Sequence, residues 1–420
     1  MSRDQAARLA AVCRHLLASG LPLLACVTAT GQTSPYVIGA SQSYAQDSNV
    51  VRLADGASLP ASVVSKADRI STTTLLGSFD QPVGRQRLSA SANLRDNRYR
   101  ENGLYDNQGF ALTGGIDWAT IERVSGNLNL SSNRTLASFD RANGNNAPNV
   151  VKNIERTDQL SATVRAGVLT RLTLEAGFSH QKQRFSESGS RLQQSVTSLG
   201  LRHQLSGGLT VGAGLRLTRG SYPDDGDDFK GRDVDLNTTW TPNSISSVVA
   251  RLSLGKTNHS LAAAQDFSGA TGALTWDWRP SAKLAFSTQF NRSTGNESSF
   301  ARIGGPASAL NAQADNSRLT TTWSVNMGYD LSAKVRLDAN VSRAARTLTN
   351  AISINAAQPS SATDGDRLQR LRLGLRYVPT RSVELSCSLG REARSADNST
   401  LTYAYHANTA GCSAQLALQP

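Results

Sequence analysis

Apolar and polar residues alternate with a period of two along most of this chain. The alternation is clearest within 272–291, where Leu274, Trp276 and Trp278 alternate with polar neighbours ahead of a short turn at 279–282. The same alternation resumes after the turn. A strand with this period has one apolar and one polar face, and two such strands joined by a tight turn form a hairpin. Because the unit recurs from about residue 36 onward, we predict an all-β fold, a single up-and-down antiparallel β-barrel that spans a membrane.

The pattern predicts about eighteen strands, many of which reach the length that a tilted membrane-spanning strand requires. Sixteen strands is the alternative, because 36–44 and 108–118 are weakly patterned. The predicted ranges are 36–44, 68–80, 86–99, 108–118, 124–137, 154–168, 171–184, 191–205, 208–221, 231–241, 246–258, 269–279, 282–293, 317–330, 334–347, 367–378, 382–394 and 403–418.

The connections between these strands alternate between short and long. Short turns at one rim and long loops at the other are typical of outer-membrane barrels, in which the short turns face the periplasm. Aromatic residues precede six of the eight short turns, which predicts an aromatic girdle at that interface. These residues are Phe79, Trp118, Trp240, Trp278, Tyr329 and Tyr377.

Each strand assigns its side chains to two environments. Leu371, Leu373 and Leu375 take the outward positions of one strand, whereas Arg370 and Arg372 take the inward ones. A barrel of 16 to 18 strands is too wide for side chains to fill, so the inward positions are expected to line a water-filled lumen. A soluble sandwich also alternates, but it seldom keeps so small and polar an inner set over so many strands.

The N-terminus resembles an export signal. Arginines at the start precede an apolar segment, and 27–29 resembles a small-x-small cleavage site, so we expect residues 1–29 to be a signal peptide and 30–420 the barrel domain. The alternative is lipoprotein processing at 23–26, with Cys26 as the acylated residue.

The composition indicates an anionic partner. The formal charge is +12, and it falls to +10 without residues 1–29, which hold three arginines and one aspartate. A basic balance suggests lipopolysaccharide phosphates, an acidic glycan or nucleic acid. Export to the cell outer membrane disfavours nucleic acid.

Inward arginines are the main candidate functional residues. They would attract anions and set the selectivity of a pore. The alternative is that they pair with inward acids, among them Asp117, Glu175, Asp235, Asp277, Asp338 and Glu384, and stiffen the wall. The pore-lining candidates are Arg87, Arg95, Arg165, Arg202, Arg216, Arg251, Arg336, Arg370, Arg372 and Arg376.

Two cysteines remain in the predicted mature chain, Cys387 and Cys412. They fall opposite one another if the last hairpin centres near 397–400, so a cross-strand disulfide is one reading and two free lipid-facing thiols are the other.

The sequence offers no catalytic or metal-binding constellation. The histidines His180, His203, His259 and His406 are scattered, and the acidic loop 224–228 lacks the ligand spacing of a calcium site. We therefore expect neither an enzyme nor a cofactor.

Three segments carry a family resemblance: 36–53, which begins YVIGASQSY; 68–88, with DRISTTT and DQPVGRQRL; and 411–416, GCSAQL. In these the chain resembles the exosortase-associated exopolysaccharide biosynthesis barrels, the EpsL-like group of porins. The resemblance covers the mature chain and implies an outer-membrane component of polysaccharide export in a Gram-negative bacterium. The chain departs from the usual barrel pattern by ending Leu-Gln-Pro and not in an aromatic residue.

Our expectation is therefore a channel of an exopolysaccharide biosynthesis and export system that passes an anionic or polar glycan through a basic lumen. Its partners would be the secreted polysaccharide, lipopolysaccharide or other outer-membrane lipid, and periplasmic export components. The alternatives are a general anion-preferring diffusion porin and a non-conducting scaffold or adhesin.

Overall fold

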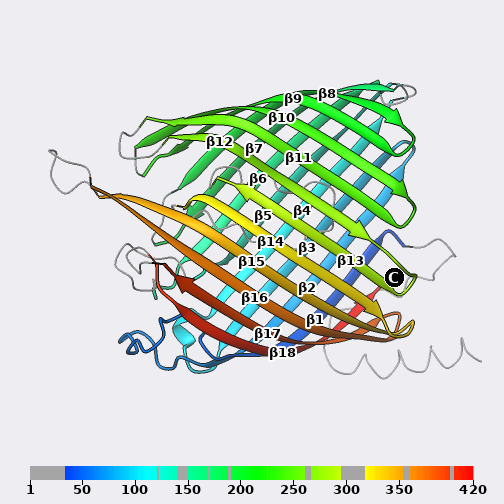
Figure 1. Ribbon diagram of the computed structural model, residues 1–420. Coiled ribbons are helices and arrows are strands. Elements are labelled where there is room, and N and C mark those ends of the chain that lie inside the picture. The colour runs from blue at the N-terminus through cyan, green and yellow to red at the C-terminus, as the bar shows by residue number, and fades with distance from the viewer. Residues whose placement is uncertain are drawn as a thin grey trace, which may run out of the picture.

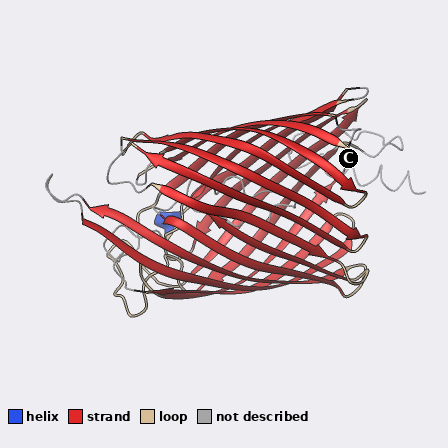
Figure 2. Cartoon of the chain, turned by 45° about the horizontal axis from the view of Figure 1, so that its top comes forward, coloured by secondary structure: helices blue, strands red, loops and turns tan. Residues whose placement is uncertain are grey.

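The chain forms one closed barrel of eighteen strands that run obliquely around a common axis (Figures 1 and 2). The computed structural model describes residues 34–120, 123–139, 150–167, 171–187, 191–224, 226–260, 266–294, 317–352, 360–397 and 402–419. The strands are β1 (Tyr36–Asp47), β2 (Asp68–Val83), β3 (Gln86–Tyr99), β4 (Asn107–Ala119), β5 (Val124–Leu136), β6 (Ile154–Ala166), β7 (Leu172–Phe185), β8 (Leu192–Ser206), β9 (Leu209–Tyr222), β10 (Asp227–Asn243), β11 (Ser246–His259), β12 (Phe267–Trp278), β13 (Leu284–Ser293), β14 (Ser317–Asp330), β15 (Val335–Ile352), β16 (Ser360–Thr380), β17 (Val383–Ala396) and β18 (Tyr405–Leu418). A short 3-10 helix, η2 (Gly103–Tyr105), follows β3.

The first and last strands close the barrel. β1 pairs antiparallel with β18 from Ile38 opposite Leu418 to Asp47 opposite Thr409, and each other strand pairs with its neighbours in the sequence. No water is available within a bilayer to satisfy a free strand edge, so closure is what permits this sheet to span the membrane. The prediction of an antiparallel up-and-down barrel is confirmed, with eighteen strands and not sixteen.

The outward face is apolar through the middle of the barrel. One continuous row crosses four strands through Leu199, Leu215, Val234 and Leu254, each in register with the next. Their exposed fractions lie between 46% and 60%. Leucine and valine side chains left this open to the surroundings are suited to lipid and not to water.

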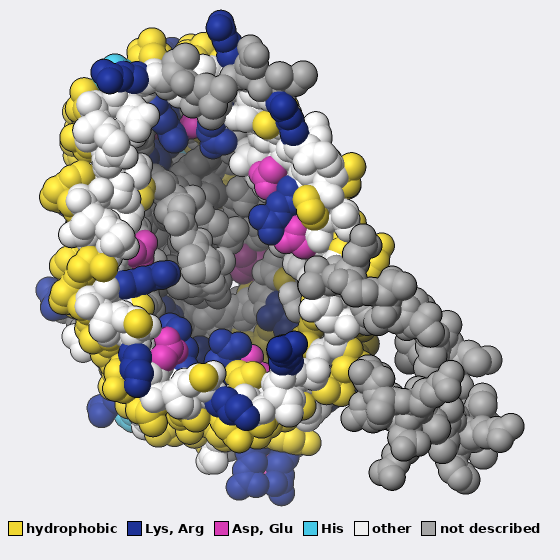
Figure 3. Space-filling model, turned by 90° about the vertical axis from the view of Figure 1, so that its right-hand side faces the viewer, with side chains coloured by type: hydrophobic (Ala, Val, Ile, Leu, Met, Phe, Trp, Pro, Cys, Tyr) yellow, Lys and Arg dark blue, Asp and Glu magenta, His cyan; other side chains and the backbone are white. Residues whose placement is uncertain are grey.

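The inward face is polar. The buried residues at the corresponding inner positions include Arg216, Asp235 and Ser253. Figure 3 looks onto the rim that carries the short turns and shows a hollow bordered by basic and acidic side chains, with hydrophobic side chains around the outside. The leucines therefore do not form a dry core, and the chain is an outer-membrane β-barrel.

Aromatic side chains form an outward girdle beside the short turns. Trp276 stacks on Trp278 at 5.8 Å between ring centroids, and Trp278 stacks on Phe286 at 5.5 Å. On the other side of the barrel Tyr36 lies 5.2 Å from Phe79. Amphipathic rings are favoured at the lipid–water interface, so this rim lies at one membrane surface.

The two rims differ as the connection lengths predict. The short turns and the C-terminal end of β18 lie at one end of the barrel, while β15 and β16 extend beyond the other strands at the opposite, long-loop end (Figure 1). β16 begins at Ser360, earlier than the alternation alone predicts, because its first residues continue the pairing with β15. The predicted signal peptide lies outside the described residues, and no described helix has the length and hydropathy needed to span a membrane.

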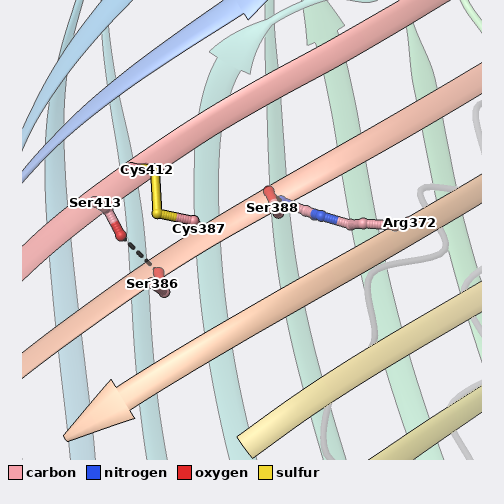
Figure 4. Close-up of a disulfide and its surroundings, with 6 residues drawn as sticks. All are labelled: Arg372, Ser386, Cys387, Ser388, Cys412 and Ser413. Atoms are coloured by element: carbon pink, nitrogen blue, oxygen red, sulfur yellow. Dashed lines mark hydrogen bonds between the residues drawn. A yellow bond between two sulfur atoms is a disulfide. The ribbon is translucent and has the colours of Figure 1, made fainter. Parts of the chain in front are cut away.

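The last two strands are joined by a disulfide between Cys387 and Cys412, which face each other in register (Figure 4). The adjacent pair Ser386 and Ser413 points to the other face, where the two hydroxyls lie 2.8 Å apart in a hydrogen bond. Because Cys412 is also in register with Tyr44, which is 67% exposed, the disulfide belongs to the lipid-facing rows.

Replacing both cysteines, Cys387→Ala with Cys412→Ala, is expected to leave the barrel able to assemble but easier to unfold. The bond closes a segment with a sequence separation of 25, and such a crosslink is worth about 3 kcal/mol through the unfolded chain. The measurement is the temperature at which the folded band disappears on semi-native gels run without reductant. Equal temperatures for the variant and the parent would contradict the expectation.

Candidate channel lumen

All ten predicted pore-lining arginines occupy inward register positions, but most of them are paired with acids. Seven form salt bridges with carboxylates of the same wall. The pairs are Arg87 with Asp80, Arg165 and Arg202 with Glu175, Arg216 with Asp235, Arg336 with Asp338, Arg370 with Glu392, and Arg376 with Glu384. The alternative prediction, that these arginines pair with inward acids, therefore holds for most of the ten.

Glu175 holds two arginines at once. Its Oε2 accepts from Arg165 Nε at 2.7 Å, and its Oε1 accepts from an Arg202 guanidinium nitrogen at 3.1 Å. The three residues come from β6, β7 and β8, so one carboxylate links three strands across the inner wall. The group carries one net positive charge, which is partly open to the lumen.

Arg216 is the most deeply buried of the ten arginines, with 3% of its side chain exposed. Its guanidinium contacts Asp235 at 3.0 Å and Asp233 at 3.5 Å. Gly255 makes room for this arrangement, because a Cβ at that position would lie 1.8 Å from the Asp233 carboxylate. A charge buried this far is stable only with well-placed partners, so this group is part of the wall and not a free binding site.

The three arginines of β16 differ from one another. Arg370 contacts Glu392 at 2.5 Å and Arg376 contacts Glu384 at 2.6 Å, whereas Arg372 donates to the hydroxyl of Ser388 at 3.2 Å. Arg372 thus lies beside a neutral oxygen (Figure 4), and no carboxylate among the described residues compensates its positive charge.

Two of the ten arginines have no carboxylate partner among the described residues: Arg372 and Arg95. Arg251 is buried and engaged with other groups. The sequence assigned all ten to the inner wall but could not distinguish these two, since pairing depends on register across strands.

The loop at 48–67 folds against the inner wall at the long-loop end. Arg52 bridges Asp47 and Glu392, with distances of 2.8 Å to each carboxylate. The side chain of Asn49 accepts from the Leu53 backbone N–H at 2.8 Å and donates to the carbonyl of residue 406 at 3.0 Å. These bonds hold the loop to β17 and β18.

An apolar cluster fixes the rest of this loop. Val51 and Leu53 are almost fully buried against Tyr105 of η2 and Phe139 after β5. The rings of Tyr105 and Phe139 lie 4.7 Å apart, edge to face. The loop is therefore packed in place at the long-loop end of the barrel, where it occupies part of the opening.

Arg52 remains charged in this setting. Burial by itself lowers the pKa of Arg52, but the carboxylates of Asp47 and Glu392 outweigh burial and raise that pKa above its ordinary value. Because Glu392 also contacts Arg370, a continuous chain of alternating charges runs from the loop to the lumen wall. The sequence alone does not reveal this role of Arg52, because its partners are 5 and 340 residues away.

The described residues contain no group of three or more His, Cys, Asp or Glu side chains arranged to hold a metal ion. His259 contacts Asp227 at 2.6 Å, His406 contacts Asp55 at 2.7 Å, and His180 contacts the Ser195 hydroxyl at 2.8 Å. These three contacts lie in different parts of the barrel.

No known protein family and no curated protein matches the sequence. Solved structures with a similar arrangement include the outer membrane protein OpdK from Pseudomonas aeruginosa, with 11% identity, a TM-score of 0.47 and coverage of 91% of this chain and 98% of that one. A BenF-like porin from Pseudomonas fluorescens gives 11% identity, a TM-score of 0.45 and coverage of 92% and 99%. The resemblance to the exopolysaccharide barrels stays a prediction.

Glu175→Gln is expected to shift ion selectivity toward anions. The change leaves Arg165 and Arg202 facing the lumen without a carboxylate. One unit charge at about 7 Å in water is worth about 0.6 kcal/mol, so the permeability ratio should change by about two- to threefold. The measurement is the reversal potential in a salt gradient across a planar bilayer. Asp224→Asn, in an exposed loop pair with Arg191, is the control and should leave the ratio unchanged.

Arg52→Ala is expected to release the 48–67 loop from the wall. It leaves Asp47 and Glu392 without their shared cation, and breaking a buried pair costs about 3–5 kcal/mol. Limited proteolysis of the folded barrel should then cut within 54–66, and Arg191→Ala, an exposed pair, serves as the control. A variant as resistant as the parent would show that the apolar cluster alone holds the loop.

Proposed function

We propose that the protein is an outer-membrane channel for small polar solutes, with a mild preference for anions. The observation that carries this proposal is the division of the wall into an apolar outer face and a charged inner face around a hollow (Figure 3). A barrel of this strand number is wide enough to hold water, and charged side chains inside it interact directly with passing ions.

The preference is mild because most inner arginines are compensated. Seven of the ten candidates have a carboxylate partner, which cancels much of their field at a distance. Arg95, Arg372 and the net positive group of Glu175 with Arg165 and Arg202 supply the remaining positive potential. A wall of closely alternating charges also orders water and favours polar solutes over apolar ones.

Export of a glycan, which the family resemblance implies, remains a prediction of the sequence. It requires that the cognate polymer block the conductance of the channel and that loss of the protein reduce secreted polysaccharide. A diffusion channel requires neither. The alternative of a scaffold or adhesin requires a barrel that does not conduct.

The double substitution Arg95→Glu with Arg372→Glu tests the proposal. It should remove the preference for anions or reverse it, because both positions face the lumen without a carboxylate partner among the described residues. The reversal potential in a salt gradient is the measurement. Arg95→Lys with Arg372→Lys keeps both charges and should behave as the parent.

Two results would count against the proposal. A correctly folded parent protein that shows no conductance would overturn the channel itself. If the parent conducts and both double variants have the same ion selectivity as the parent, these two arginines do not set the selectivity.

A further inference from the structure

A cluster of four cations lies on the outward face near the long-loop ends of β9, β10 and β11. The cluster consists of Arg219, Lys230, Arg232 and Lys256, and we call it the outer cation cluster. Lys230 is in register with Arg219, and Arg232 with Lys256, so the four side chains are cross-strand neighbours. All four are exposed.

These cations lack the compensation found inside the barrel. On the same strands Arg216 points inward and is bound by Asp233 and Asp235. By contrast, no member of the outer cation cluster forms a salt bridge within the described part of the chain. Like charges placed opposite each other on neighbouring strands destabilise a sheet, so this arrangement calls for an external anion.

The cluster borders the lipid-facing band. Arg232 is in register with Leu217, and the next outward residue of β10 is Val234. On β11 the next outward residue toward the membrane is Leu254, two positions before Lys256. The cations therefore lie where apolar side chains end, at the rim with the long loops, which in outer-membrane barrels is the rim away from the periplasm.

A hollow in the barrel surface lies nearer the middle of the membrane than the cluster, and no cluster residue is among those that line it. Its volume is about 510 Å³, and Ala250, Ala270 and Gly272 are among its lining residues. Ala270 is in register with Leu254. On the outward face this pair is the next one toward the middle of the membrane from the pair formed by Lys256 and Ser268. The lining is mainly hydrocarbon, with leucine and phenylalanine side chains around the small residues, and it also includes Arg292.

A second row of outward arginines lies at the same end of the barrel. Arg134, Arg156 and Arg184 are in register across β5, β6 and β7. Here Asp158 contacts both Arg156 and Arg184 at 3.1 Å, so this row is partly neutralised. Outward cations are thus grouped at two places on this rim. Of the two groups, the outer cation cluster has more charge without a carboxylate partner.

We propose that the outer cation cluster binds the phosphate groups of a phosphorylated glycolipid in the outer leaflet, with one acyl chain of that lipid in the hollow. Phosphate groups carry the charge that the four cations lack, and guanidinium groups bind phosphate through paired hydrogen bonds. The order of the features, cations at the rim and a hydrocarbon recess below them, matches the order of headgroup and chain in a lipid.

The test compares lipid binding by the folded, full-length protein and by two quadruple variants. One variant replaces the cluster, Arg219→Gln, Lys230→Gln, Arg232→Gln and Lys256→Gln. The matched control removes the same numbers of arginines and lysines at the opposite rim, Arg279→Gln, Lys283→Gln, Lys334→Gln and Arg381→Gln. Native mass spectrometry with hexa-acylated lipid A is the measurement, and the folded band on semi-native gels shows that each variant is folded.

Each cation near an anionic surface contributes roughly a factor of five to binding, so the cluster variant, which loses four cations, should lose affinity by roughly six hundredfold. The control variant should bind as the parent does. Dephosphorylated lipid A should bind the parent about as weakly as lipid A binds the cluster variant. Ala270→Phe, which fills the hollow and leaves all four cations in place, should also weaken binding.

Three outcomes would overturn the proposal. The first is equal binding of lipid A by the cluster variant and the parent. The second is equal binding of the phosphorylated and dephosphorylated lipids by the parent. The third is complete displacement of lipid A by millimolar inorganic phosphate, which would assign the cluster to free phosphate and not to a lipid.

Discussion

Backbone hydrogen bonding in the absence of water is the constraint on which this structure depends. Every strand within the bilayer must satisfy both of its edges, and a sheet can do so only by joining its last strand to its first. The pairing of β1 with β18 supplies that joint. Once the ring is closed, period-two alternation assigns each side chain to lipid or to the lumen, and the apolar and charged faces follow from it.

The sequence predicted the parts of the structure that depend on local alternation. The outward position of Leu371 and the inward position of Arg370 follow from parity on a single strand, which the printed sequence displays. The ends of the strands were less predictable: β16 begins several residues before its alternation becomes regular because it pairs with β15. Pairing between strands is a property of two segments, and neither segment shows it alone.

The same limitation explains what the sequence could not show at the lumen. Glu175 was recognised as an inward acid, but its position between Arg165 and Arg202 depends on the registers of three strands. The folded loop at 48–67 was harder still, because Arg52 meets Glu392 only after the barrel has closed. Alternation within a strand predicts which charged side chains face the lumen. Which of these charges have a partner is decided only by the pairing of strands in the assembled barrel.

The two faces also treat positive charge differently. Inside, acids from neighbouring strands accompany most arginines, so the wall supplies its own counter-charges. Outside, at the long-loop rim, Lys230 and Arg232 are each in register with a cation on one adjoining strand and with an uncharged residue on the other. The net positive charge of the chain is therefore expressed more fully toward the surrounding lipid than toward the lumen.

The disulfide between Cys387 and Cys412 has a consequence for the order of events in biogenesis. A thiol reacts through its thiolate, and an anion of this kind is strongly disfavoured in hydrocarbon. Since both sulfur atoms belong to lipid-facing rows, oxidation must precede their contact with acyl chains. The final hairpin therefore enters the bilayer already crosslinked, and water-soluble reductants cannot reach the bond afterwards.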